Sequence, residues 1–407
     1  MKLKDTITIK LILPIYILAV SFVLTSCKSE DSPVEPNIET RGGLISSTQL
    51  PSITKEFIKS YLNDYNITID AKYNVDAYKI VYYTDDTKGN LTIASGALFI
   101  PQGKDNLPLI SLHHGTQTDR EKVGSVSRFN APEGIIGAAL GYYSLVPDYL
   151  GLGESQLIHP YLYAKSSADA VIDFIRACRK EADDLNIKLN GQVFLAGYSE
   201  GGYVTLAAHR EIQLHYGNEI TITASSPMAG PYDPYLTSKT ILENPTYGKP
   251  SYMAYLAAAY NSIYGWNNLK GIFNSPYAEL IPSLIDGTKT IDEIDAQLTS
   301  DLTKLFTQNF LTTFLDGTEK DFSNALRENN LIDWTPAAPI RFYHGSDDQF
   351  VPYQNSIEAR DYFLAHGANV ELVTIEGGDH ATSLMPSILG AIDWFDSIRL
   401  SKVLAYK

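Results

Sequence analysis

Short, continuous apolar runs alternate with helical stretches along most of the chain. A run in which every position is apolar predicts a strand buried on both faces, because a strand with one face in water alternates apolar and polar residues. Strands are expected at Leu109–Leu112, Tyr143–Val146, Val193–Ala196, Ile220–Thr223, Ile340–Tyr343 and Val370–Ile375. Helices are expected at Pro132–Leu140, Ser167–Glu181, Glu200–His215, Asn355–Ala365 and Ala381–Leu400. This alternation predicts an α/β fold with a mostly parallel central sheet and helices on both of its faces.

The segment before these runs has a different pattern. Apolar positions at helical spacing predict a helix over Thr54–Tyr65. Two strands are expected next, at Ala77–Thr84 and Leu91–Ile100, joined by the polar turn Asp85–Asn90. The folded domain is therefore expected to cover residues 51–407.

Residues 235–335 interrupt the alternation and contain no convincing strand. Their apolar positions predict helices at Tyr252–Tyr264, Ile291–Phe314 and Asp321–Asn329. We expect a helical insertion that lies as a lid over the carboxyl edge of the sheet. A separate helical domain is the alternative, because so long a stretch is unusual as a simple connection.

Residues 1–27 have the charge and hydropathy pattern of an export signal. Basic residues precede the apolar run Leu11–Leu24, which is short for a membrane-spanning helix. The run ends in Leu24-Thr25-Ser26-Cys27, which resembles the cleavage box of bacterial lipoproteins. That resemblance implies a lipid anchor on Cys27. An ordinary signal peptide or an uncleaved anchor is the alternative.

Residues 28–50 are rich in Ser, Pro, Glu and Thr, which predicts a flexible tether between the lipid and the domain. The expected location is the outer membrane or cell surface of a Gram-negative bacterium, with the periplasmic face as the alternative. The formal net charge is −15, and removing the +2 carried by residues 1–27 leaves −17. A surface this acidic argues against nucleic acid as a partner. The other cysteine, Cys178, follows apolar helical positions and is expected to be a buried core residue.

The segment Gly197-Tyr198-Ser199-Glu200-Gly201 carries the candidate nucleophile. It matches G-x-S-x-G, and it directly follows an expected strand and precedes an expected helix. In this context the glycines permit a sharp, strained turn that exposes the serine hydroxyl. Helix N-terminal amides then lie beside Ser199, where they can stabilise a developing oxyanion.

A serine hydroxyl needs a base, and the base needs an acid that orients it. With this turn the order along the chain is serine, acid, histidine, which leaves His380 as the base. The segment from His344 to Pro352 resembles the H-G-x-x-D-x-x-V-P loop of α/β-hydrolases and puts the acid at Asp348, with Asp347 as the alternative.

The oxyanion hole needs two backbone amides. One is expected from Glu200, and the other from the loop after the strand at Leu109–Leu112, where Thr116 is the choice and Gln117 the alternative. The adjacent His113 and His114 do not predict a metal site, because neighbours on a strand point to opposite faces. No metal and no cofactor are expected.

Taken together, these motifs resemble the α/β-hydrolase superfamily, and within it the secretory lipases and related bacterial lipases and esterases. The detailed match lies in His113–Thr116, Pro147–Gly153, Gly197–Gly202 and Ser226–Tyr232. The resemblance implies a helical lid and hydrolysis of a small-molecule or lipid ester by Ser199, His380 and Asp348 through an acyl-enzyme. Within the Pro147–Gly153 match, Asp148 is interpreted as structural, bonding amides of its turn.

Three other functions remain open at this point. A serine peptidase of the prolyl-peptidase type uses the same three residue types, and a glycan esterase that removes acetyl or feruloyl groups would suit a cell-surface protein. A binding lipoprotein without activity is the alternative outside enzymes, although a complete set of catalytic residue types argues against it.

Overall fold

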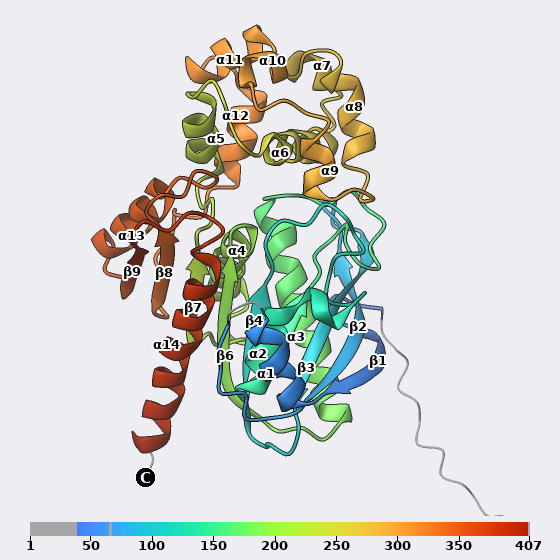
Figure 1. The fold of residues 1–407 in the computed structure, drawn as a ribbon, viewed down its shortest axis with the longest axis vertical. Helices are drawn as coiled ribbons and strands as arrows, with labels where there is room; N and C mark the ends of the chain where they lie inside the picture. The colour runs from blue at the N-terminus through green and yellow to red at the C-terminus, as the bar shows by residue number, and fades with distance from the viewer. Residues whose placement is uncertain (1–38, 65–66, 406–407) are drawn as a thin grey trace, which may run out of the picture. The chain divides into compact units, whose positions relative to one another are not determined.

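Figure 1 shows the computed structural model, which describes residues 39–64 and 67–405. The predicted signal peptide, Cys27 and residues 28–38 of the predicted tether lie outside the described residues. The strands are β1 (Leu44–Ile53), β2 (Val75–Asp85), β3 (Leu91–Pro101), β4 (Leu107–His113), β5 (Tyr143–Pro147), β6 (Leu189–Tyr198), β7 (Ala224–Met228), β8 (Ile340–Gly345) and β9 (Val370–Ile375). Outside the insertion the helices are α1 (Lys55–Asn63), α2 (Pro132–Ala139), α3 (Ala164–Asp184), α4 (Glu200–His215), α13 (Gln354–Ala365) and α14 (Leu384–Ala405), with a short 3-10 helix at Arg128–Asn130.

The strands form one nine-stranded sheet in the order β1-β2-β3-β5-β4-β6-β7-β8-β9. The strands β1, β2, β3 and β5 pair antiparallel with one another, whereas every pair from β5 through β4 to β9 is parallel. The predicted α/β class with a mostly parallel sheet is therefore confirmed. Parallel strands end at one edge, so the loops after β4, β6 and β8 meet there.

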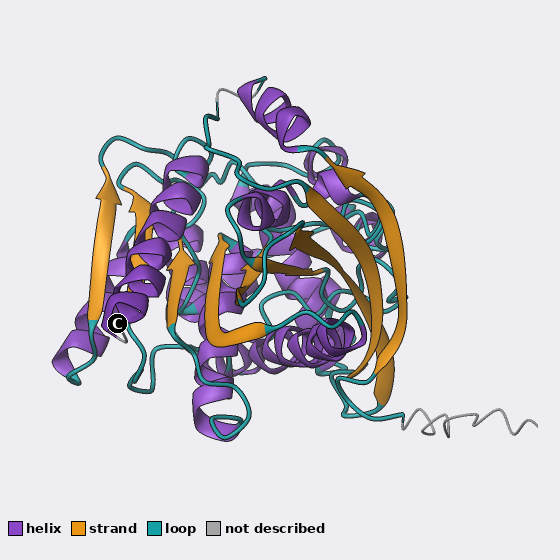
Figure 2. Cartoon of the chain, turned by 90° about the horizontal axis from the view of Figure 1, so that it is seen from below, coloured by secondary structure: helices purple, strands orange, loops and turns teal. Residues whose placement is uncertain are grey.

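Helices cover both faces of the sheet (Figure 2). Neighbouring residues of β6 enter two different apolar clusters. Leu195 packs in the cluster that contains Phe174 of α3, whereas Phe194 packs in the cluster that contains Ile135 of α2 and Phe395 of α14. Each fully buried side chain of this kind contributes about 1.5–3 kcal/mol to stability. The continuous apolar run of β6 thus follows from its burial on both faces.

The first strand corrects the predicted tether. Residues 28–50 were expected to be flexible, but β1 begins at Leu44 and pairs antiparallel with β2. The Ser47 hydroxyl donates to the Glu181 carboxylate at 2.7 Å, and the Arg41 guanidinium is 2.7 Å from Asp169 and 3.0 Å from Asp173. The segment is polar because β1 is an edge strand held by backbone pairing and by these polar contacts rather than by apolar burial.

The strand before the insertion is also displaced from its predicted place. The sequence predicts Ile220–Thr223, but β7 covers Ala224–Met228. Its buried hydroxyls have partners, since Ser225 bonds His209 at 2.8 Å and Ser226 donates to the carbonyl of Arg341 at 2.8 Å. A central strand made of small polar residues has no apolar run by which hydropathy would detect it.

Residues between β7 and β8 form helices and no named strand. They are α5 (Pro234–Leu242), α6 (Pro250–Ile263), α7 (Leu269–Ile272), α8 (Tyr277–Leu284), α9 (Ile291–Asp295), α10 (Leu302–Leu305), α11 (Gln308–Leu315) and α12 (Asp321–Glu328). The single helix predicted at Ile291–Phe314 is wrong, because caps at Asp301 and Thr307 divide it into α9, α10 and α11. In Figure 1 this insertion lies beyond the end of β6 that carries Ser199. Among the helices of the described residues, none combines the length and hydropathy needed to cross a bilayer.

Candidate active site

Ser199 occupies a strained turn between β6 and α4. Its φ of 61° and ψ of −121° lie outside the regions that residues with a side chain favour. A methyl group added at Gly197 would approach the carbonyl oxygen of Gly201 to 2.3 Å, and one added at Gly201 would approach that of His113 to 1.9 Å. The two glycines therefore let the turn pack against the end of β4, as the motif predicts.

Three predicted side chains are brought together at this turn. The Ser199 Oγ lies 2.9 Å from Nε2 of His380, and Nδ1 of His380 lies 2.5 Å from Oδ2 of Asp348. Ser199 and Asp348 are buried, and His380 is largely so. This continuous chain of hydrogen bonds runs from a hydroxyl to a carboxylate through one imidazole, which is the geometry required for base-assisted nucleophilic attack.

Asp348 is held in place by other bonds besides that to His380. Its Oδ1 accepts from the amides of Phe350 and Val351 at 2.9 Å each, and His344 Nε2 lies 3.2 Å from Oδ2. Burial alone would raise the pKa of Asp348, but the hydrogen bonds from His344 and His380 outweigh burial and hold it well below its ordinary value. The alternative acid, Asp347, is exposed and accepts a bond from Ser346.

The loop that carries His380 is fixed from two sides. Asp379 accepts from the amides of Ala381 and Thr382 at 3.0 and 2.8 Å. The hydroxyl of Tyr198 donates to the carbonyl oxygen of His380 at 2.8 Å, and the two rings are 5.1 Å apart. The helix α14 therefore starts at Leu384 rather than at the predicted Ala381. Tyr198, the variable residue before the serine, thus positions the histidine loop, which its motif does not indicate.

The two predicted oxyanion residues lie on either side of Ser199. Glu200 is the first residue of α4, and a methyl group added at Gly115 would be 3.8 Å from Cβ of Ser199, so the loop containing Thr116 adjoins the serine. The Thr116 side chain is buried and bonds the hydroxyl of Tyr161 at 3.0 Å. Gln117 also lies in this loop, and its carbonyl oxygen is 3.5 Å from the hydroxyl of Tyr255.

Glu200 has a buried partner that sequence reasoning missed. His159 Nε2 lies 2.6 Å from Glu200 Oε1, and His159 Nδ1 lies 2.7 Å from the carbonyl oxygen of Leu150. A carbonyl oxygen can only accept a hydrogen bond, so His159 Nδ1 donates to that of Leu150. The bond between His159 Nε2 and Glu200 Oε1 contains one proton, which the ring and the carboxyl group share. His159 precedes Ser199 in the chain, and only the folded structure brings it beside the residue that follows the serine.

Replacing His159 with leucine is expected to lower the free energy of unfolding by about 3–5 kcal/mol, because the Glu200 carboxyl would remain buried without its partner. Urea denaturation measures this loss. Glu200→Gln is the matched control, since its amide can still donate to His159 Nε2, and a much smaller loss is expected. A His159→Leu variant as stable as the unaltered protein would contradict the interpretation.

The neighbouring histidines have structural roles. His113 is buried between the hydroxyls of Ser111 and Thr205, at 3.0 and 2.7 Å, and burial lowers its pKa to about 3. Both ring nitrogens of His114 face backbone carbonyl oxygens, those of Gly115 and Asp148.

Two further predicted residues lie inside the fold. Asp148 accepts from the Ser95 hydroxyl at 2.6 Å and the Ser125 amide at 3.2 Å, which corrects the expectation that it bonds amides of its own turn. Cys178, on the buried face of α3, is fully buried in the apolar core, as predicted.

The space above Ser199 is narrow and apolar. A cavity of about 30 Å³ separates the serine from α5 and α6. Its walls include Tyr161, Tyr247, Tyr252, Met253, Leu256 and Phe350. The insertion therefore covers the serine closely in this structure.

The chain that carries this geometry is similar to proteins of a known family. The sequence profile of a family described as secretory lipase matches residues 135–403, which include Ser199, Asp348 and His380. Lipase 5 of Candida albicans is 25% identical over 273 residues, which are 62% of this chain and 54% of that protein. The chain thus spans about half the length of the curated relatives it matches.

Solved structures match over a larger share of the chain. The rice cell wall degrading esterase LipA from Xanthomonas oryzae is 30% identical, with a TM-score of 0.78, and the match covers 86% of this chain and 95% of that one. Candida antarctica lipase A in its closed state shares the fold at a TM-score of 0.67 and 18% identity, over 87% of this chain and 83% of that one.

Proposed function

Because the chain belongs to the secretory lipase family of α/β-hydrolases, we propose that it hydrolyses carboxylic esters with Ser199 as nucleophile, His380 as base and Asp348 as the residue that orients the base. The observation that carries this proposal is the unbroken set of bonds from Ser199 Oγ through His380 to Asp348. Each residue stands on a different loop at one edge of the sheet, so only the fold brings them together.

The reaction proceeds in two steps. His380 Nε2 takes the proton of Ser199 while Oγ attacks the ester carbonyl, and the imidazolium is stabilised by the Asp348 carboxylate. His380 then gives that proton to the departing alcohol, which leaves an acyl group on Ser199. Water repeats the attack with His380 again as base, and the acid is released. Apart from the substrate and this water, the groups that react belong to the chain.

The negative oxygen of each intermediate is stabilised by the backbone amides of Thr116 and Glu200. One donor of this kind contributes about 2.7–4 kcal/mol to the transition state. Glu200 could oppose this effect, because a carboxylate close to an oxyanion repels it. The proton shared with His159 reduces the negative charge of the Glu200 carboxyl and limits that repulsion.

A substrate series tests the ester specificity. The purified protein is assayed with p-nitrophenyl esters of increasing acyl length and, in parallel, with amino-acid p-nitroanilides. We expect turnover of the esters and at most trace turnover of the amides. Turnover of amides alone would favour the peptidase alternative and contradict the proposal, and no turnover of either would favour a binding protein.

A glycan ester is the second candidate substrate. The similarity to the rice cell wall degrading esterase favours it, because that relative matches the chain over most of both lengths. The same three residues would remove acetyl or feruloyl groups from a polysaccharide by the same steps. Release of acetate or ferulate from esterified xylan, compared with release of fatty acid from a triacylglycerol emulsion, separates this candidate from a lipase.

The domain organisation proposed for the whole chain is a lipidated Cys27, a short tether and a hydrolase domain that starts near β1, with α5–α12 as its lid. It supports a location at the outer membrane or cell surface, where an ester substrate would be met outside the cell.

Replacing Cys27 with serine is expected to move the protein from the membrane fraction to the soluble fraction, because the thiol that carries the lipid is lost. Fractionation followed by immunoblotting measures this shift. Cys178→Ala is the matched control and should remain with the membrane, since Cys178 is buried in the domain core. Membrane retention of Cys27→Ser would indicate a spanning anchor instead.

A further inference from the structure

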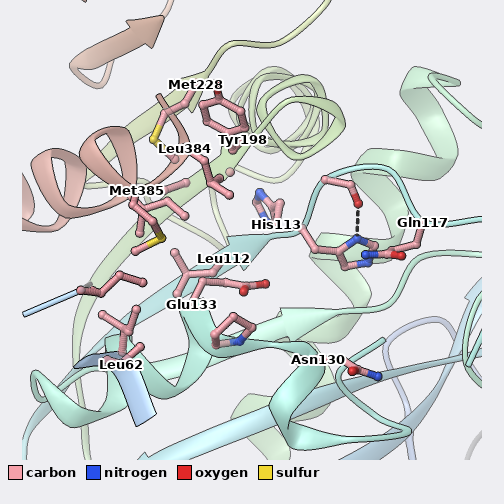
Figure 3. A pocket seen from close by; sticks show the side chains of 18 of the residues that line it. Leu62, Leu112, His113, Gln117, Asn130, Glu133, Tyr198, Met228, Leu384 and Met385 are labelled. Atoms are coloured by element: carbon pink, nitrogen blue, oxygen red, sulfur yellow. Dashed lines mark hydrogen bonds between the residues drawn. The ribbon is translucent and has the colours of Figure 1, made fainter. Parts of the chain in front are cut away.

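A second, larger cavity lies beside the nucleophile turn, with Tyr198 and Gln117 of the site described above among its lining residues (Figure 3). Its volume is about 510 Å³, and residues of α2, β4, β6 and α14 contribute to its walls. No lining residue comes from the insertion, and Ser199 does not line it. The walls are mainly apolar, formed by Leu112, Ile136, Met228, Leu384, Met385 and Ile388. Volumes of this order are typical of sites that bind small molecules.

One carboxyl group breaks the apolar character of this cavity. Glu133, in the first turn of α2, lines it, and Figure 3 shows its side chain next to that of Leu112. Its Oε1 is buried and has no hydrogen-bond partner among the described residues. Burial raises the pKa of Glu133 above its ordinary value. His114 also lines the cavity, but its two ring nitrogens bond the carbonyl oxygens of Gly115 and Asp148. It therefore does not supply a partner for Glu133 Oε1.

A buried oxygen without a partner is unfavourable unless something else supplies the bond. A core that served only packing would place an apolar residue at this point. The cavity combines an unpaired oxygen with an apolar space large enough for an aliphatic chain. This combination indicates a ligand with two parts that match these two features. One part is an aliphatic chain, and the other is a single hydrogen-bond donor.

We propose that this cavity binds a neutral aliphatic alcohol, with the chain among the apolar walls and the hydroxyl donating to Oε1 of Glu133. A hydroxyl can donate to this oxygen, and it carries no charge into the apolar space. A fatty-acid anion does not fit, because it would carry a negative charge into an apolar space that has no lysine or arginine among its described lining residues. Leu384 is 36% exposed and lines the cavity, so the aliphatic chain of the alcohol enters past this side chain. The proposal does not rest on the proposed hydrolysis, although Gly197 and Tyr198 of the nucleophile turn also line the cavity.

Isothermal titration calorimetry of the purified full-length protein with 1-decanol tests the proposal, with decanoate as the matched probe. We expect saturable one-site binding of 1-decanol, and binding of decanoate weaker by at least about tenfold. Glu133→Leu, which removes the acceptor, should weaken 1-decanol about tenfold, the upper end of what one neutral hydrogen bond contributes. Glu133→Gln, which keeps an acceptor oxygen, should bind 1-decanol nearly as the unaltered protein does.

Two bulky substitutions locate the bound alcohol. Leu384→Trp narrows the entrance of this cavity at a partly exposed position and should abolish binding, whereas Met253→Trp fills the space above Ser199 and should leave it unchanged. Loss of binding in Met253→Trp with retention in Leu384→Trp would place the alcohol in the catalytic pocket and overturn the proposal. Absence of saturable 1-decanol binding to the unaltered protein, or equal binding of decanoate, would also overturn it.

Discussion

Replacing Ser199 with alanine is expected to reduce kcat for a p-nitrophenyl ester by about a millionfold, while the melting temperature stays close to that of the unaltered protein. The substitution removes the oxygen that bonds His380 Nε2 and attacks the ester, so no acyl-enzyme can form on this residue. Alanine has the same backbone restrictions as serine at a φ of 61°, so the strain of the turn is unchanged. Initial-rate kinetics and thermal unfolding measure the two quantities.

The matched control is Ser226→Ala in the adjacent strand β7. The Ser226 hydroxyl donates to the carbonyl oxygen of Arg341 and does not reach the His380 ring in the described hydrogen bonds. Its loss is expected to cost stability of about 1 kcal/mol and to leave kcat near its original value. Substantial activity in Ser199→Ala would show that another residue is the nucleophile.

Replacing Asp348 with asparagine should lower kcat by about ten-thousandfold, with a small change in KM. The amide preserves the shape of the side chain but cannot stabilise the imidazolium, and it favours the wrong tautomer of His380. Asp347→Asn alters the adjacent carboxyl group and is expected to leave kcat within about twofold, because this exposed side chain bonds Ser346 rather than His380.

These two variants separate the alternatives that the sequence leaves open. A large loss in Asp347→Asn with a small loss in Asp348→Asn would move the acid by one position. That pattern of activity loss would contradict the catalytic role inferred from the hydrogen bond of 2.5 Å between Asp348 and His380. Steady-state kinetics of both purified variants on one ester is sufficient to decide.

The elements nearest the candidate site are those that the sequence predicts best. The turn around Ser199 is local, since its two glycines, the preceding strand and the following helix are all within a short segment. β6 contains the apolar run Val193–Ala196, and β9 consists mainly of valine, leucine and isoleucine, so hydropathy and strand propensity detect them. His380 follows from the order of residue types along the chain, and Asp348 from the loop that contains it.

The elements that the sequence misses depend on partners far along the chain. β1 is polar because backbone pairing with β2 holds it, and β7 is hidden because its serines bond His209 and the carbonyl of Arg341. The bond between His159 and Glu200 joins residues 41 positions apart and has no local signal. Hydropathy and motifs therefore could not predict the contacts in which polar groups are paired with residues far along the chain.

The most direct test of the central claim is covalent labelling with a fluorophosphonate, followed by mass spectrometry of the digested protein. Such a reagent reacts with a serine that a neighbouring base activates, so the modified residue is identified rather than inferred. The account predicts one modified peptide, with the label on Ser199, and loss of labelling in His380→Ala. A folded protein that takes up no label, or a label on a different serine, would contradict it.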